Sequence, residues 1–299
     1  MITPRYLEKG DKIGIVAPAR KISLEEITPA IKILENWGFN IVLGKNLFKS
    51  KNQFSGSDKE RAEDMQDMLN NRDVKAIFCA RGGYGTIKIL EHLNFDKFTA
   101  SPKWIIGYSD ITALHAHVNT NLNIETLHAT MPINFANNNT ESLNSLLSAV
   151  TGKKLFYHVN EHKYNNKGKC EGEIVGGNLS VIYSIAATKY DINTKNKILF
   201  IEDLDEYLYH IDRMMMNLKL SGKFDNLKGL IIGGMNKMND NTVPFGKNAY
   251  EIIHEIIKDY NFPVCFNFKA GHIEPNLALI LGRKVKLNIS NSIDIEFTD

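Results

Sequence analysis

Short apolar runs alternate with stretches of helical spacing along the first half of the chain. Each apolar run is short enough for a buried strand, and each intervening stretch places its apolar residues on one face of a helix. Strands that alternate with helices predict a parallel sheet with right-handed crossovers and helices on both faces. The expected strands are residues 12–18, 40–43, 74–80 and 103–107, and the expected helices are residues 24–37, 57–70 and 86–93.

The stretch 104–112 places Ser109 where the fourth of these strands gives way to a helix. A serine on a sharp strand-to-helix turn is exposed at the sheet edge, near backbone N–H groups that can hold a developing oxyanion. The match to the nucleophile elbow G-x-S-x-G is partial, because Ile111 occupies the position of the second glycine. The pattern therefore indicates a nucleophilic serine in a departure from the usual hydrolase motif.

A glycine loop, residues 81–85, follows the third strand and lies at the same expected sheet edge as Ser109. Glycines let the backbone approach an anion closely, so this loop suits either a phosphate or an oxyanion. It matches neither G-x-G-x-x-G nor G-x-x-x-x-G-K-[ST], which disfavours nucleotide binding. A second such loop, residues 176–178, lies in the other half of the chain and is also explained by a tight strand-to-helix turn.

A nucleophilic serine needs a histidine as its base. His115 and His117 lie on the helix after Ser109 and point along it, whereas His128 is placed to line the site. His272 is favoured, because it follows a strand in a glycine-preceded loop, where catalytic groups are often carried. A surface histidine that caps a turn is the structural alternative.

The base in turn needs a carboxylate to orient it. Glu202 comes at the end of an apolar strand, directly before Asp203. Asp205 and Glu206 follow closely, and sequence order alone does not choose among the four.

Composition narrows the class of protein. The 299 residues carry 36 basic and 34 acidic side chains, a formal charge of +2, which does not suggest a nucleic-acid-binding surface. Three widely separated cysteines argue against a disulfide framework and against a C-x-x-C zinc site. We expect no signal peptide, no membrane span and a cytoplasmic location.

The second half of the chain differs in character, and a polar stretch rich in asparagine and lysine separates it from the first. We expect an α/β N-terminal domain at residues 1–155, a linker at 156–170 and a C-terminal domain at 171–299.

These motifs together resemble the LD-carboxypeptidase family of serine peptidases, which includes the microcin-immunity peptidases. The resemblance implies a catalytic triad of Ser109, Glu202 and His272 and an oxyanion hole formed by the backbone N–H groups of Gly83 and Asp110. It spans nearly the whole chain and rests on Arg81-Gly82-Gly83-Tyr84-Gly85, Gly107-Tyr108-Ser109-Asp110, Gly176-Gly177-Asn178-Leu179, Ile201-Glu202-Asp203 and Ala270-Gly271-His272.

The family fold implied by this resemblance is a flavodoxin-like parallel-sheet N-terminal domain with a smaller, mainly β C-terminal domain. Family members release the terminal D-alanine from cytosolic murein tetrapeptides during wall recycling, commonly as homodimers and without a metal or cofactor. We expect Asn178 and His128 to bind substrate. Arg81 is the nearest cation by sequence for the substrate carboxylate, although a salt bridge that stabilises its loop explains it equally well.

The microcin-immunity members instead cleave peptidyl-nucleotide conjugates and are expected to stack an aromatic side chain, often tryptophan, on the base. The tryptophans of this chain are Trp37 and Trp104, and neither lies in the 157–172 loop where we expect such a residue. This favours the murein substrate, although Tyr157 and Tyr164 keep the alternative open.

Overall fold

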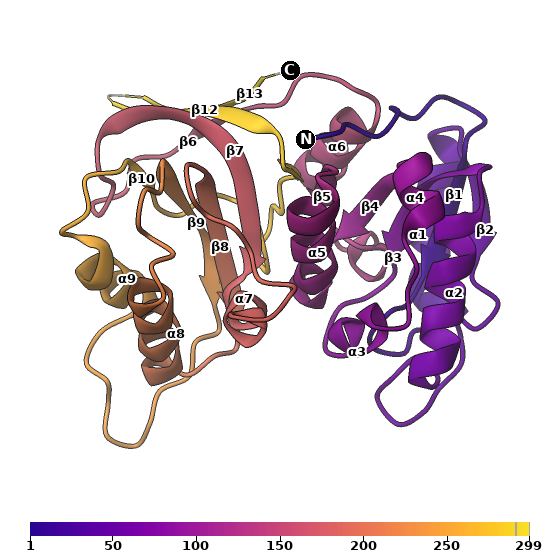
Figure 1. The fold of residues 1–299 in the computed structure, drawn as a ribbon, viewed down its shortest axis with the longest axis horizontal. Helices are drawn as coiled ribbons and strands as arrows, with labels where there is room; N and C mark the ends of the chain where they lie inside the picture. The colour runs from indigo at the N-terminus through magenta and orange to yellow at the C-terminus, as the bar shows by residue number, and fades with distance from the viewer. Residues whose placement is uncertain (291, 299) are drawn as a thin grey trace.

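Two sheets, one in each half of the chain, organise the computed structural model, which describes residues 1–290 and 292–298 (Figure 1). The first sheet has the strand order β11-β5-β4-β3-β1-β2. Neighbouring strands are parallel except β11, which pairs antiparallel with β5. The parallel sheet expected for the first half is therefore confirmed. Its strands are β1 (Lys12–Val16), β2 (Asn40–Leu43), β3 (Val74–Cys79), β4 (Trp104–Gly107), β5 (Thr126–His128) and β11 (Leu279–Leu281).

Helices cover both faces of the first sheet because successive strand residues point to opposite sides. Phe78 of β3 belongs to the same hydrophobic cluster as α1 and α6, whereas its neighbour Ile77 packs in the cluster that contains α2 and α5. Capping boxes at Ser23 and Ser57 fix the starts of α1 and α2. The helical segments are α1 (Leu24–Asn36), α2 (Asp58–Asn70), α3 (Thr86–Leu90), α4 (Asp96–Ala100), η1 (Ser109–Ile111), α5 (Thr112–Leu122), η2 (Pro132–Asn134) and α6 (Thr140–Val150).

The second sheet has the order β10-β9-β8-β7-β12-β13-β6 and combines two kinds of pairing. Strands β7 to β10 are parallel, whereas β12, β13 and β6 are antiparallel to their neighbours. The fold class is thus confirmed, with a mixed second sheet. Its elements are β6 (Phe156–Val159), β7 (Gly168–Asn178), α7 (Leu179–Ile185), β8 (Ile198–Leu204), α8 (Leu208–Leu220), β9 (Gly229–Asn236), α9 (Ala249–Ile257), β10 (Val264–Cys265), β12 (Lys284–Ile289) and β13 (Ile293–Phe297).

The expected linker, residues 156–170, contains strand β6 and the first residues of β7. Strand β6 pairs with β13, so this polar segment forms one edge of the second sheet. Its polar sequence fits an edge strand, because one face of such a strand meets water. The domain limits themselves stay a prediction.

Strand β11 ties the two halves together, because it lies late in the chain but completes the first sheet. Next to it, Arg283 donates to the Glu125 carboxylate, with 3.1 Å between Arg283 Nε and Glu125 Oε1. Asn119 donates to the carbonyl of Leu281 at 3.4 Å. Both contacts are buried, so they hold the halves in one arrangement.

Among residues 1–290 and 292–298, none of the helices has the length and hydropathy of a membrane span.

Gly176 near the end of β7 provides a test of the close packing between β7 and β8. Its φ is +129°, and a Cβ there would lie 1.9 Å from the carbonyl oxygen of Phe200. Gly176→Ala is expected to lower the free energy of unfolding by roughly 3 kcal/mol or more, because backbone must shift to admit the methyl group. Gly10→Ala is the matched control, since Gly10 also has a positive φ of +91° but nothing within 4 Å of the added Cβ.

Gly10→Ala should lower the free energy of unfolding by only about 1 kcal/mol, which is the penalty of a side chain at positive φ. Urea unfolding of both variants measures the difference. Equal losses would contradict the packing argument.

Candidate active site

Ser109 follows the short turn after β4 and begins η1, so the structure has the strand-to-helix context that the sequence predicts. Its φ is +64°, in the left-handed region that residues other than glycine seldom adopt. Such a conformation costs of order 1 kcal/mol and is often found at functional sites. The flanking residues Tyr108 and Asp110 are buried, whereas Ser109 is partly exposed. The turn therefore presents the serine to the surface.

Ile111 has a packing role at the position where the hydrolase motif has a second glycine. It is fully buried, and a Cβ on Gly107 would lie 2.9 Å from Ile111 Cγ1. Glycine is thus needed at position 107 so that Ile111 can fill the core beneath the turn.

The glycine loop between β3 and α3 lies directly against Ser109. A Cβ on Gly82 would lie 3.0 Å from Ser109 Oγ. Gly83, at a φ of +112°, has an N–H with no hydrogen-bond acceptor among the described residues. An unpaired N–H beside the serine hydroxyl fits an oxyanion hole. The roles of Gly83 and Asp110 in such a hole stay predictions.

Two buried side chains hold this loop in place, and no sequence motif predicts either role. The Asp110 carboxylate accepts a hydrogen bond from the N–H of Thr86 at 2.7 Å, which joins the start of α3 to the serine turn. The Arg61 guanidinium, wholly buried, donates to the carbonyl of Gly85 at 2.9 Å and to that of Pro18. Asp110 thus uses its side chain for structure, which leaves only its main chain for the predicted oxyanion contact.

Glu202, from the second sheet, and His272, from the loop before β11, form a close pair. Glu202 lies in β8 and is fully buried, and its Oε2 accepts hydrogen bonds from His272 Nδ1 at 2.7 Å and from the His272 N–H at 3.1 Å. Gly271 makes this approach possible, because a Cβ there would lie 2.4 Å from the same oxygen. The bond at Nδ1 leaves Nε2 as the nitrogen that can accept a proton.

Opposite pKa shifts distinguish Glu202 from the adjacent Asp203. Burial opposes the charge on Glu202, but the charge and hydrogen bond of His272 outweigh it and lower the pKa of Glu202. Burial also opposes the charge on His272, yet Glu202 outweighs it and raises the pKa of that imidazole. Burial, followed by the charge of Glu202, raises the pKa of Asp203 to about 7. Glu202 is therefore the carboxylate that is charged at neutral pH and able to stabilise an imidazolium.

The other carboxylates near Glu202 have different partners. Asp203 accepts from the Ser180 N–H at 2.9 Å at the start of α7. The side chain of Asp205 accepts from Asn239, and that of Glu206 pairs with His210. Of the four carboxylates, Glu202 is the one that hydrogen-bonds to the His272 ring, and its catalytic role stays a prediction.

Within residues 1–290 and 292–298, the remaining candidate histidines have no hydrogen-bonded carboxylate partner. His115 is fully buried with its Nε2 2.9 Å from the carbonyl oxygen of Gly107, and burial lowers the pKa of His115 to about 3. His117 bonds to Asn121. His128 is fully buried, and within the described part of the chain its ring nitrogens have no hydrogen-bond partner. Burial lowers the pKa of His128 to about 4, so this ring is neutral at physiological pH.

His128 packs against a residue of the serine turn. Its ring contacts Tyr108, with 5.8 Å between ring centroids, and the Tyr108 ring in turn lies 4.8 Å from that of His272. Tyr108, which the sequence analysis did not single out, thus connects the serine turn to the histidine. Substrate binding by His128 stays a prediction.

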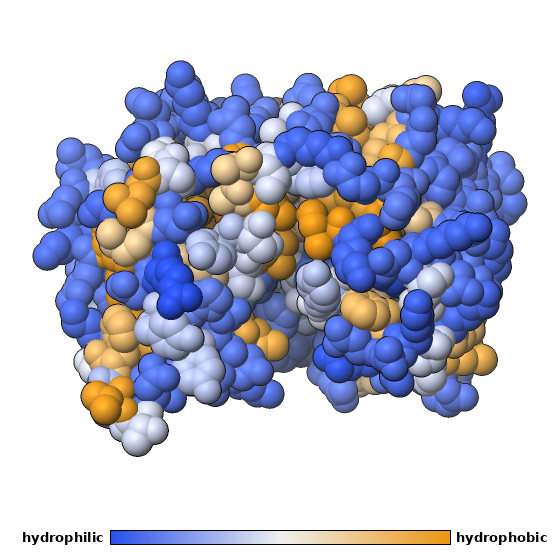
Figure 2. Space-filling model, turned by 60° about the horizontal axis from the view of Figure 1, so that its bottom comes forward, coloured by the Kyte–Doolittle hydropathy of each residue, from blue (hydrophilic) through white to orange (hydrophobic). Residues whose placement is uncertain are grey.

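Contacts between the halves bring the two parts of the site together. The N–H of Asn178, at the end of β7, donates to Thr112 Oγ1 at the start of α5 at 2.9 Å. In Figure 1, α3 and α7, which follow the two glycine loops, both lie at the lower side of the molecule. Figure 2 shows this side as a surface hollowed between two largely hydrophilic halves. Among the described residues Ser109 has no side-chain hydrogen bond, and its contact with His272 stays a prediction.

The loop that carries His272 is fastened to the first half through Glu274. This carboxylate accepts hydrogen bonds from the N–H of Asn139 at 2.8 Å and from Ser142 Oγ at 3.0 Å, both at the start of α6. The position of His272 relative to the first sheet therefore depends on these contacts.

Arg81 and Asn178, the expected substrate-binding residues, both have partners within the protein. Arg81 donates to the carbonyl of Lys21 at 3.3 Å and to Glu26 at 3.5 Å. The Asn178 amide donates to Asp203 at 2.9 Å, and its oxygen caps α7. Their contacts with substrate stay predictions.

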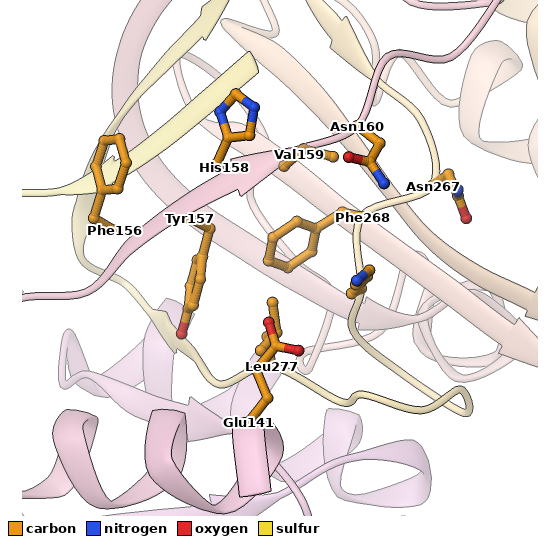
Figure 3. A pocket seen from close by; sticks show the side chains of 10 residues that line it. Glu141, Phe156, Tyr157, His158, Val159, Asn160, Asn267, Phe268 and Leu277 are labelled. Carbon is orange, nitrogen blue, oxygen red and sulfur yellow. The ribbon is translucent and has the colours of Figure 1, made fainter. Parts of the chain in front are cut away.

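A separate cavity of about 260 Å³ lies between β6, α6 and the segment before β11, as Figure 3 shows. Tyr157 and Phe268 line it, together with Glu141 and Leu277. No residue of the expected site lines this cavity, so we do not connect it with the serine.

A serine on a strand-to-helix turn in one half of the chain and a hydrogen-bonded acid and histidine pair in the other fit an α/β hydrolase built on two sheets. Comparison with known proteins agrees with this class. Residues 13–129 match the family model described as the LD-carboxypeptidase N-terminal domain, and residues 171–287 match that of the LD-carboxypeptidase C-terminal domain. The chain therefore belongs to the LD-carboxypeptidase family and is a peptidase.

Relatives within this family carry two kinds of name. A probable murein peptide carboxypeptidase from Bacillus subtilis is 35% identical over 95% of this chain and 91% of the relative. The murein tetrapeptide carboxypeptidase of Pseudomonas aeruginosa is 25% identical over 92% of each chain. The solved structure of the microcin C7 self-immunity protein MccF in complex with aspartyl sulfamoyl adenosine has a TM-score of 0.90 at 26% identity, covering 100% of this chain and 99% of that one.

Proposed function

We propose that this chain is a serine carboxypeptidase that hydrolyses the L,D-peptide bond to the C-terminal D-alanine of murein tetrapeptides. The observation that carries the proposal is the hydrogen bond of 2.7 Å between buried Glu202 of β8 and His272, whose loop Glu274 holds against the serine-bearing half. The murein carboxypeptidases among the relatives support the substrate class.

In this mechanism Ser109 Oγ attacks the carbonyl carbon of the scissile bond, and His272 Nε2 takes the hydroxyl proton. Glu202 stabilises the imidazolium through Nδ1. The negative oxygen of the tetrahedral intermediate accepts hydrogen bonds from the N–H groups of Gly83 and Asp110. His272 then gives its proton to the departing amine of D-alanine. Water, activated by His272 in the same way, attacks the acyl-enzyme and releases the shortened peptide from Ser109.

We further propose a cytoplasmic location and a homodimer, with neither metal nor organic cofactor in the reaction. In that location the proposed activity would serve cell-wall recycling. Apart from substrate and water, each mechanistic step above uses only side chains and backbone groups of the chain.

Cleavage of a peptidyl-nucleotide conjugate is the second candidate function, and the likeness to MccF favours it. Two aromatic residues that could stack on a base in the 157–172 region have other partners. Tyr157 is buried and donates to the carbonyl of Ala278 at 2.7 Å. Tyr164 stacks on His254 with 4.6 Å between ring centroids. These contacts favour the murein substrate.

A substrate panel tests the proposal. L-Ala-γ-D-Glu-L-Lys-D-Ala and its diaminopimelate analogue are compared with the tetrapeptide ending in L-alanine, a simple ester and an aspartyl adenosine phosphoramidate. We expect kcat/KM for one of the D-alanine peptides to exceed the others by roughly 100-fold, because the site selects the stereochemistry of the leaving residue. Faster turnover of the nucleotide conjugate would favour the second candidate, and preference for the ester would exclude both.

A further inference from the structure

The leaving residue of a carboxypeptidase fixes where its carboxylate must bind. Three bonds separate the attacked carbonyl carbon from the carboxylate carbon of a single C-terminal residue, a distance of about 4 Å at most. The carbonyl oxygen would lie at the Gly83 N–H under the proposed function, on which this inference rests. A group that holds the carboxylate must therefore lie beside the glycine loop.

Arg20 lies directly across this loop. A Cβ on Gly83 would be 2.1 Å from Arg20 Cδ and 2.3 Å from Arg20 Cγ, so the arginine side chain crosses the Cα of Gly83. The Arg20 N–H also donates to the carbonyl of Gly82 at 3.4 Å. Since Nε is bonded to Cδ, the guanidinium begins immediately beside the predicted oxyanion hole.

The Arg20 guanidinium is also available to a ligand. Its side chain is exposed and forms no hydrogen bond or ion pair with any residue in 1–290 or 292–298. The other two arginines at the loop are engaged. Arg61 is buried against the carbonyls of Pro18 and Gly85, and Arg81 bonds to Lys21 and Glu26.

Electrostatics favours a cation at this position. The site contains the buried Glu202, which is charged at neutral pH and repels an anionic substrate end. An arginine offers a planar pair of donors that matches a carboxylate and offsets this repulsion. We propose that Arg20 binds the C-terminal carboxylate of the substrate and so restricts the enzyme to removing a single terminal residue.

The test compares a tetrapeptide that ends in D-alanine with the same peptide ending in D-alaninamide. For the free acid, Arg20→Gln is expected to lower kcat/KM by roughly 10- to 100-fold, mainly through KM, because a charge-assisted bidentate contact is lost. For the amide, the change should be below about threefold, and Arg20→Lys should restore part of the selectivity for the acid. Lys21→Gln removes a neighbouring exposed charge and should change kcat/KM by less than about twofold.

Equal losses of kcat/KM on the acid and the amide, or a similar loss in Lys21→Gln, would overturn the role of Arg20. The proposed function would still stand in that case, provided that the unmodified enzyme releases D-alanine. If the unmodified enzyme released alanine from neither peptide, the proposed function would fail and this inference with it. Thermal unfolding of each variant confirms that the fold is unchanged.

Discussion

Replacement of Ser109 by alanine is expected to reduce kcat for D-alanine release by roughly 10⁵-fold or more, because no other group can form the acyl-enzyme. The fold should persist. Alanine and serine bear similar strain at the φ of +64° found here, and the described structure gives the serine hydroxyl no hydrogen bond to lose.

Release of D-alanine from the tetrapeptide, followed by chromatography, measures this loss. Ser184→Ala is the matched control, since Ser184 lies in α7 and bonds only to the carbonyl of Val181. Activity of the Ser109→Ala variant near that of the control would exclude the serine mechanism. Unchanged urea unfolding in both variants shows that the effect is chemical.

The second large effect is expected for Glu202→Gln, which keeps the shape of the side chain but removes its charge. We expect kcat to fall by roughly 10³- to 10⁴-fold, because the imidazolium of His272 loses its stabilising carboxylate and the ring loses its preferred tautomer. The variant leaves a buried amide next to His272, so its thermal stability is measured in parallel.

The pH dependence gives a second readout. A general base must be neutral, so kcat/KM falls as the pH drops through the pKa of His272, which Glu202 holds above 6.5. Without that charge, burial lowers the pKa of His272, and the acid limb should move to lower pH. Profiles between about pH 5 and 9 measure the shift. Glu206→Gln, which removes the carboxylate paired with His210, should leave the limb in place. An unmoved limb in Glu202→Gln would show that another group is titrating.

The sequence predicts the first sheet well because its strands are short apolar runs bounded by polar loops. Strands β2 and β4 fall where the pattern places them. The second sheet is harder to predict from the sequence. Strand β6 has a burial pattern that alternates between exposed and buried residues in a polar segment, so its composition resembles that of a loop. Pairing between residues distant in the chain, as in β11 with β5, leaves no local signal.

In the candidate site too, local patterns predict some residues, whereas contacts between distant parts of the chain decide the others. Ser109 could be identified from a local strand-to-helix pattern. The choice between Glu202 and Asp203 could not, because adjacent strand residues point to opposite faces and either face could have met His272. Arg61 lies on α2 and resembles any surface arginine in the sequence, so only the tertiary structure shows that it is buried and holds the glycine loop.

Strand β11 has a consequence for biosynthesis. A nascent chain that has emerged only as far as β10 contains Ser109 and Glu202, but it lacks His272 and the strand that borders β5. Peptidase activity should therefore appear only after about nine-tenths of the polypeptide has left the ribosome, when His272 is present and β11 (Leu279–Leu281) can join the first sheet. Fragments released before this point would accordingly be inactive.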